Sequence, residues 1–316
     1  TLVEGVDVNR MKKLIGARDP LGIRPLILGD VNGCPVLASE TCALDIIGGE
    51  YVRDIEPGEI VVFSQDGVES FKPFPQMRPR PCIFEYVYFA RPDSIVNGLS
   101  IYEVRRSMGQ ILAQECPINA DVVVPVPDSG VPAALGYAEA SGIPFQLGII
   151  RNHYVGRTFI QPSQQRRTAG VRMKLSANRS QITGKRVILV DDSIVRGTTS
   201  AKIVQMVRDA GAKEVHLLSA SPPIEWPDYY GIDTPEREHL LAATHSLKQM
   251  EQKLGVDSLG FLTVGGLYKA MGEQKRNDEY PQYTDHYFTG DYPTRLLDKD
   301  SAKADKDRQL SFLVEA

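Results

Sequence analysis

Residues 186–200 read RVILVDDSIVRGTTS, and this stretch decides the fold class of the chain. An apolar run ends in two adjacent carboxylates, Asp191 and Asp192, and a loop containing Gly197 then opens a helical pattern. A helix N-terminus offers free N–H groups and partial positive charge to a phosphate, and glycine lets the backbone approach a ligand closely. Either feature alone is common at ordinary strand ends and helix caps. Together they predict a phosphate-binding turn beside two hard oxygen ligands.

The chain around this stretch alternates between apolar runs and helical patterns. Helices are predicted for residues 100–115, 132–142 and 198–212, and strands for the runs DVVVPVP (121–127), PFQLGII (144–150), VILVDD (187–192) and EVHLLSA (214–220). Such alternation indicates an α/β domain with a parallel sheet whose ligand lies at the carboxyl ends of the strands. The Walker loop and the Rossmann G-x-G-x-x-G pattern are both absent from the sequence.

The rest of the chain divides by composition. Residues 1–72 contain short β-type runs broken by Gly, Pro and Asp, which predict an antiparallel unit. Residues 73–99 begin with PFPQMRPRP, a linker too rich in proline for a helix or a central strand, and lead into the α/β domain at 100–272. Residues 273–316, rich in Asp, Lys and Tyr, are interpreted as an irregular tail.

A second candidate anion loop lies one strand–helix–strand step earlier. Asp128, Ser129 and Gly130 stand between the predicted strand at 121–127 and the following helix. Residues of these types are also common at such junctions for capping reasons alone. The position of the loop before the acidic pair, rather than its composition, is what favours a binding role.

Residues 151–176 form a long polar stretch without clear periodicity, and loops of that length in compact domains are usually functional or disordered. A solvated basic loop is one interpretation. The alternative is a lid that neutralises a polyanion and excludes water, because basic residues concentrate here in a chain of formal charge −4. These basic residues are Arg151, Arg157, Arg166, Arg167, Arg172 and Lys174.

The runs EYVYFARPDS, YVGRTFIQPSQ, VRMKLSANR and VDDSIVRGTTS together resemble the glutamine phosphoribosylpyrophosphate amidotransferases, from about Lys13 to Leu297. The resemblance implies a type I phosphoribosyltransferase sheet preceded by part of an N-terminal-nucleophile glutaminase domain, for which residues 1–72 would be a remnant. It also implies a Mg²⁺-dependent pentosyltransferase of the first step of purine biosynthesis. That enzyme forms 5-phosphoribosylamine and pyrophosphate from phosphoribosyl pyrophosphate and ammonia, which complete members take from glutamine. Inhibitory purine nucleotides and a homotetramer are further implications.

The resemblance assigns roles to particular residues. The implied catalytic residues are Asp191, Asp192, Arg157 and Lys174, and the implied Mg²⁺ ligands are Ser129, Asp191 and Asp192. The pyrophosphate would be bound by Asp128, Ser129 and Gly130, and the 5′-phosphate by Arg196, Gly197, Thr198 and Thr199. The lid that forms an ammonia channel would contain Tyr154, Arg157 and Ile160. Many members carry Lys at the position of Arg151, so nucleotide inhibition is expected to differ in detail there.

Two departures from the family pattern carry expectations of their own. Members begin with a glutaminase domain whose first residues are a catalytic Cys-Gly, whereas this sequence starts with TLVEGV and resembles only the last part of that domain. The chain as given is therefore expected to make phosphoribosylamine from ammonia but not from glutamine. Some members bind an iron–sulfur cluster through four cysteines, but here only Cys82 matches, and the other positions fall on Asp228, Thr284 and Tyr287. No cluster is therefore expected. Cys82 is interpreted as a buried small residue and His286 as part of the tail.

The bulk properties exclude some classes of protein. A formal charge of −4 argues against a protein that mainly binds nucleic acid, and no apolar run approaches the length of a membrane span. The four cysteines show no C-x-x-C spacing, which is typical of reduced thiols in a cytoplasmic protein. Two other functions stay open: a base-salvage phosphoribosyltransferase, and a regulator that binds phosphoribosyl pyrophosphate or nucleotides without catalysis.

Overall fold

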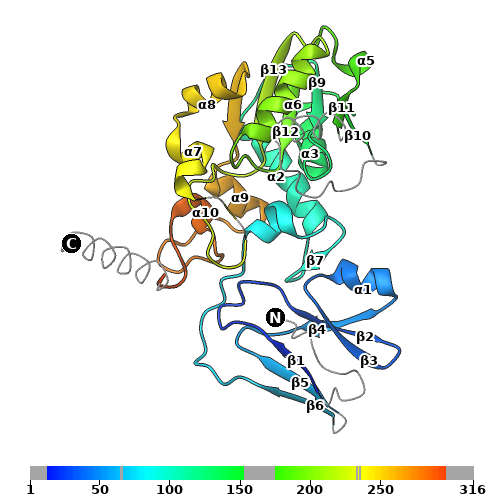
Figure 1. The fold of residues 1–316 in the computed structure, drawn as a ribbon, viewed down its shortest axis with the longest axis vertical. Coiled ribbons are helices and arrows are strands. Elements are labelled where there is room, and N and C mark those ends of the chain that lie inside the picture. Colours follow the sequence, from blue (N-terminus) through cyan, green and yellow to red (C-terminus); the bar gives the residue numbers. More distant parts are fainter. Residues whose placement is uncertain (1–12, 65–66, 153–174, 233, 235, 297–316) are drawn as a thin grey trace, which may run out of the picture.

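The computed structural model describes residues 13–64, 67–152, 175–232, 234 and 236–296. An antiparallel N-terminal unit stands at one end of the molecule, and a helix-covered parallel sheet stands at the other (Figure 1). No helix among these described residues is long and apolar enough to cross a membrane.

The N-terminal unit consists of two three-stranded antiparallel sheets, as the sequence predicts. One has the order β1-β5-β6 and the other β3-β2-β4. Their elements are β1 (Lys13–Ala17), β2 (Ile27–Val31), β3 (Cys34–Ala38), α1 (Thr41–Ile47), β4 (Glu50–Asp54), β5 (Ile60–Ser64) and β6 (Gly67–Phe71). The hydrophobic cluster between them is small, with Leu28, Ile55, Val61 and Phe63 as its buried members.

An ion pair between the buried Glu59 carboxylate and the partly exposed Arg53 adds to this small core. The Arg53 guanidinium donates two hydrogen bonds of 2.7 and 2.8 Å to the Glu59 carboxylate, which also accepts from the Ser70 hydroxyl at 2.6 Å. Glu59 is 2% exposed. The Arg53 hydrogen bonds, which favour the ionised carboxylate, lower the pKa of Glu59 from its ordinary 4.5 to about 2.

We expect Glu59→Gln to lower the free energy of unfolding by about 2 kcal/mol at pH 7, because Arg53 loses its charged partner. The wild-type contribution should be complete above pH 4.5 and should be lost as the pH falls towards 2, since the folded-state pKa lies below the unfolded value. Urea unfolding followed by circular dichroism at pH 7 and pH 3 tests both statements. The difference between the two proteins should shrink at pH 3, and an unchanged difference would contradict the assignment.

The segment after the proline-rich linker forms a short π-helix, η2 (Glu85–Phe89). Arg105, which is 3% exposed, donates hydrogen bonds to the carbonyl oxygens of Tyr86 and Ala90, both at 2.8 Å. On the other side, Arg24 of the N-terminal unit forms a 2.7 Å ion pair with Glu85. Isolated π-turns are rare and often lie at functional sites.

The parallel sheet has the strand order β14-β13-β12-β9, which confirms the predicted α/β class. Its side chains alternate between two buried cores, with Val123 and Ile188 on one face and Val124 and Leu189 on the other. The first face is covered by α2 (Ile101–Glu115), α3 (Val131–Ser141) and α9 (Val264–Ala270), and the second by α6 (Thr198–Asp209) and α8 (Leu247–Leu254). The strands are β9 (Val122–Pro125), β12 (Arg186–Asp191), β13 (Glu214–Ser219) and β14 (Ser258–Phe261).

The run at 144–150 does not form the parallel strand that the sequence predicts. Its pairing with the parallel sheet is limited to an isolated bridge between Phe145 and Val123. In this bridge the Val123 N–H donates to the Pro144 carbonyl oxygen and the Gln146 N–H donates to the Val123 carbonyl oxygen, both at 2.9 Å. The end of the run belongs to β10 (Ile149–Arg151), which pairs antiparallel with β11 (Leu175–Ala177) on the far side of the long polar stretch. The smaller elements of the chain are β7 (Ile95–Val96), β8 (Leu99–Ser100), α5 (Arg179–Ile182), η3 (Arg237–His239), α7 (Leu241–Thr244) and α10 (His286–Thr289).

The interpretation of 273–316 as a tail is wrong for its described part. Thr284, Asp285 and His286 are fully buried, and His286 lies 3.0 Å from the carboxylate of Asp228. Arg276 donates to Asp285 at 2.7 Å and to Asp291 at 2.6 Å. Arg276 thus ties the segment to itself, whereas the body of the molecule holds it through Asp228 beside His286 and through Arg80, which lies 3.8 Å from Asp285 and 3.4 Å from Asp291.

Candidate active site

The two loops singled out in the sequence lie next to each other at the carboxyl edge of the parallel sheet. β9 and β12 are neighbours with Pro125 opposite Val190, and the Val126 N–H donates to the Val190 carbonyl oxygen at 2.9 Å. The loops that follow these strands, 126–130 and 191–197, therefore share one edge of the sheet. This is the place where open α/β sheets bind ligands.

The acidic pair is largely buried. Asp192 is 7% exposed, and its carboxylate accepts from the hydroxyls of Ser193, at 2.6 Å, and of Ser129. Burial raises the pKa of Asp191 and that of Asp192, and the charge of Asp192 raises the pKa of Asp191 further. No ion pair reaches either carboxylate among the described residues. A divalent cation fits this donor set, because two carboxylates and a hydroxyl are hard oxygen ligands whose mutual repulsion a cation would relieve.

The loop after the acidic pair presents unused backbone donors. Within the described residues, the amide N–H groups of 193–199 donate no hydrogen bond. Gly197 has φ +72°, and a Cβ there would lie 2.7 Å from the Leu241 side chain. Arg196, Thr198 and Thr199 are exposed at the start of α6, as a phosphate site requires.

The other loop is built around a close backbone approach. A Cβ on Gly130 would lie 2.4 Å from the Val190 carbonyl oxygen, so only glycine fits beside β12. The Pro127–Asp128 peptide bond is cis, and α3 begins directly after Gly130. Asp128 is exposed and forms an ion pair with Arg151.

Comparison with known proteins agrees with this geometry. Residues 93–220 match the phosphoribosyl transferase domain family. A protein named amidophosphoribosyltransferase from Rhizobium etli is 61% identical over 293 residues, which are 91% of this chain and 59% of that protein. The solved glutamine phosphoribosylpyrophosphate amidotransferase from Bacillus subtilis, complexed with ADP and GMP, superposes with a TM-score of 0.82 at 50% identity and covers 90% of this chain.

The chain is a homologue of the amidophosphoribosyltransferases. The resemblance drawn from the sequence motifs and the type I phosphoribosyltransferase fold are thereby confirmed. The match is partial in one respect, because the chain spans only 59% of the R. etli protein and 62% of the solved B. subtilis chain.

Part of the predicted site lies outside the described residues. Tyr154, Arg157, Ile160 and Lys174 all fall within 153–174, so their roles stay predictions. The flanks of this segment are described, and they bring Arg151 opposite Leu175 in the β10–β11 pair.

The four positions that correspond to cluster ligands of the amidophosphoribosyltransferase family do come together in space. The backbone of Cys82 forms an isolated parallel β-bridge with Thr284. The Cys82 Sγ lies 3.3 Å from the Tyr287 hydroxyl, which also contacts the Asp228 carboxylate. Burial raises the pKa of the Cys82 thiol to about 11. One buried thiol among oxygen groups does not fit a four-thiolate cluster.

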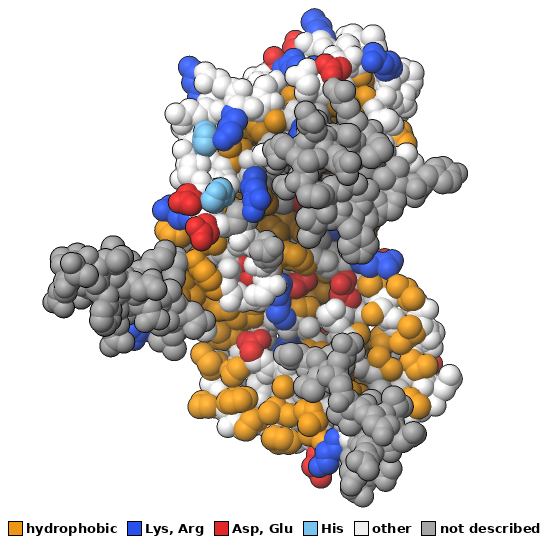
Figure 2. All heavy atoms as spheres, in the orientation of Figure 1, with side chains coloured by type: hydrophobic (Ala, Val, Ile, Leu, Met, Phe, Trp, Pro, Cys, Tyr) orange, Lys and Arg blue, Asp and Glu red, His pale blue; other side chains and the backbone are white. Residues whose placement is uncertain are grey.

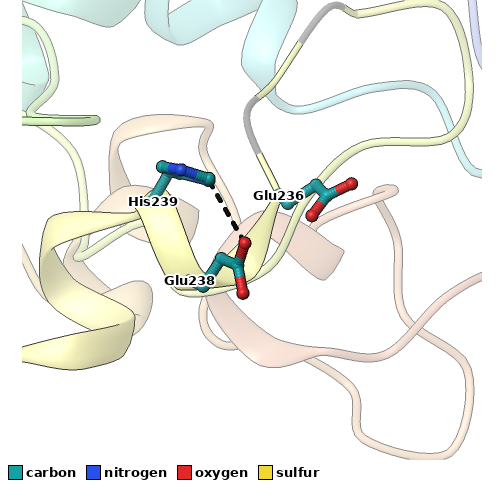
Figure 3. A group of neighbouring side chains, drawn as sticks. All are labelled: Glu236, Glu238 and His239. Atoms are coloured by element: carbon teal, nitrogen blue, oxygen red, sulfur yellow. Dashed lines mark ion pairs between the residues drawn. The ribbon is translucent and has the colours of Figure 1, made fainter.

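A further group of possible metal ligands lies on the surface. Glu236, Glu238 and His239 lie close together around η3, and Glu238 pairs with His239 at 3.8 Å (Figure 3). All three side chains are exposed. Exposed acidic groups of this kind are common, and we assign no function to them.

The sequence analysis missed the buried Arg105 near the active-site face. Arg105 carries a positive charge into the core that covers this side of the sheet, and its field favours the ionised form of Asp192. Its position in a helical repeat of mixed polarity gave no signal, because a buried arginine and a solvated one look alike in a single sequence.

Proposed function

We propose that this chain carries out the transferase half of the amidophosphoribosyltransferase reaction. Ammonia displaces pyrophosphate from C1 of phosphoribosyl pyrophosphate, and the product is 5-phosphoribosylamine, the first intermediate of purine biosynthesis. The observation that carries the proposal is the shared sheet edge, where a largely buried acidic pair begins one of two neighbouring glycine-bearing loops. Homology to amidophosphoribosyltransferases supports the same reaction.

The residues divide the substrate between them. The free amides of 193–199, with Arg196, Thr198 and Thr199, would bind the 5′-phosphate, and the loop at 128–130 would bind the pyrophosphate. Asp191, Asp192 and Ser129 would hold Mg²⁺ and the ribose hydroxyls. When bound, Mg²⁺ supplies positive charge that stabilises the departing pyrophosphate. The protein residues then act mainly by positioning the substrate and stabilising charge, without a protein nucleophile.

The decisive measurement is steady-state pyrophosphate release from phosphoribosyl pyrophosphate with Mg²⁺ and a high concentration of ammonium at alkaline pH. We expect turnover that depends on both ammonia and Mg²⁺. Hypoxanthine and adenine, offered in place of ammonia, should not be converted. Turnover with a purine base would instead indicate a salvage transferase, and binding without any turnover would indicate a regulator.

The N-terminal unit supports a second part of the proposal, namely that it belongs to a glutaminase domain. Hydrophobic side chains gather over this unit at the molecular surface (Figure 2), among them Ile15, Ile46, Val68 and Phe71. Such a surface around a small core fits a domain that needs more polypeptide to be complete. Joining the N-terminal two fifths of the R. etli relative should therefore slow hydrogen exchange in β1 and β6, and unchanged exchange would contradict this part.

Other properties stay predictions. We expect the protein to be colourless, since three of the four cluster positions lack cysteine, and iron and sulfide assays on an anaerobic preparation test this. Inhibition by purine nucleotides gains support from the ADP and GMP named with the B. subtilis enzyme. Sedimentation measurements test the homotetramer, and cell fractionation tests the cytoplasmic location.

A further inference from the structure

A carboxylate stands where the proposed function needs an anion to bind. Asp128 follows the buried strand β9 and precedes α3, at the loop proposed for the pyrophosphate, and its side chain is 58% exposed. An ionised carboxylate in the loop repels a pyrophosphate group bound there. The loop could bind through its backbone alone, so the presence of this charged side chain calls for a different reason.

The partner of Asp128 gives that reason. Arg151, the last residue of β10, directs its guanidinium to the Asp128 carboxylate, and Nη1 donates a hydrogen bond to Oδ2. Antiparallel pairing with Leu175 of β11 fixes the backbone from which Arg151 extends. The β10–β11 pair therefore places the Arg151 guanidinium at the pyrophosphate loop, and Asp128 determines where this charged group lies.

The Arg151 guanidinium has donors beyond the one that Asp128 accepts. Arginine has five N–H donors, and Asp128 is the only side-chain partner of Arg151 among the described residues. The Arg151 side chain is 46% exposed. An exposed pair of this kind adds little to stability, so its location at the loop is more informative than its contribution to folding. Arginine also binds phosphate oxygens in a two-point geometry that suits a pyrophosphate.

We propose that Arg151 binds the pyrophosphate group of the substrate, and that Asp128 is a positioning residue that holds the Arg151 guanidinium over the loop. This inference rests on the proposed function for the identity of the ligand. It changes the role of Asp128, which the sequence motif had suggested as a direct pyrophosphate ligand.

A double-mutant cycle separates the two roles of Asp128. The probe is inorganic pyrophosphate with Mg²⁺, titrated calorimetrically into the wild type, Arg151→Gln, Asp128→Asn and the double variant. We expect Arg151→Gln to weaken binding about tenfold or more, and Arg151→Lys to recover part of the loss. Asp128→Asn should weaken binding in the wild-type background. In the Arg151→Gln background it should leave binding unchanged or tighten it, because only the repulsive charge is then removed.

The same variants can refute the inference. If Asp128→Asn weakens binding by the same factor in both backgrounds, Asp128 contacts the Mg²⁺-bound ligand itself, and the positioning role is overturned. Unchanged binding in Arg151→Gln would overturn the role of Arg151. The Arg186–Asp121 pair is the matched control, because it is an Arg–Asp pair at the opposite end of the same strands. Arg186→Gln should not alter pyrophosphate binding.

The outcome is distinguishable from failure of the proposed function. Wild-type protein that binds pyrophosphate with the expected cycle but does not turn over would contradict the transferase and support this inference. Normal turnover with an additive cycle would support the transferase and contradict this inference.

Discussion

Asp192→Asn is expected to lower the rate of phosphoribosylamine formation by about 100-fold or more. The substitution keeps the size of the side chain but removes the charge that would hold Mg²⁺ or orient the ribose hydroxyls. The side chain lies 7% exposed, within hydrogen-bond reach of Ser193, so the amide can keep part of this local bonding. Pyrophosphate release at saturating Mg²⁺ and ammonium is the measurement.

The control for this variant is Asp121→Asn, which removes a carboxylate at the amino end of the same pair of strands. It should retain wild-type turnover. Circular dichroism and the unfolding midpoint of Asp192→Asn should stay close to those of the wild type, since removing one of two adjacent buried carboxylates relieves repulsion. Near wild-type turnover in a folded Asp192→Asn protein would show that the acidic pair has no part in the reaction.

Gly136→Ala is expected to destabilise the protein by about 3 kcal/mol or more. α2 and α3 cross so closely that a Cβ on Gly136 would lie 1.9 Å from the Arg106 carbonyl oxygen. The reciprocal contact is equally close, because a Cβ on Gly109 would lie 1.8 Å from the Ala133 carbonyl oxygen. The neighbouring atoms belong to the backbone, so the helices must separate, and the core between them and the sheet opens.

A matched variant isolates this effect from helix propensity. Gly265 is an exposed position in α9 with open space around its Cβ direction. Gly265→Ala should leave stability unchanged or raise it by about 0.5–1 kcal/mol, as alanine does in a helix. Urea unfolding of the two variants beside the wild type provides the test. Equal stability of Gly136→Ala and the wild type would mean that the helices separate at little cost.

The sequence was most informative where the signal was local. The stretch 186–200 correctly predicted the strand, the acidic pair at its end and the start of the helix, because each depends on residues adjacent in the chain. The loop at 128–130 was found for the same reason. The two loops meet because parallel neighbouring strands end at one edge, which is a general property of the α/β class and needs no knowledge of particular contacts.

The sequence was least informative where distant residues decide the structure. Apolar residues at 144–150 suggested another parallel strand, but pairing with β11 withdraws Ile149 from that sheet. The polar composition after residue 273 suggested a tail, although Arg80 pairs with Asp285 and Asp228 lies beside the buried His286. Partners of this kind are set by the folded structure, and a single sequence does not reveal which charges will meet.

The π-helix η2 has contacts to both the N-terminal unit and the α/β domain, in addition to the covalent linker. Arg24 holds Glu85 from the N-terminal unit, while Arg105 holds the carbonyl oxygens of the same turn from α2. A short way along, Glu40 at the start of α1 accepts hydrogen bonds from the Arg91 amide and the Ser94 hydroxyl. Breakage of the exposed chain at 73–79 should thus leave the two pieces in contact. The linker at 73–81 is thus the boundary along the chain, but η2 is where contacts from both units meet. A displacement of the N-terminal unit should therefore reach α2 through η2.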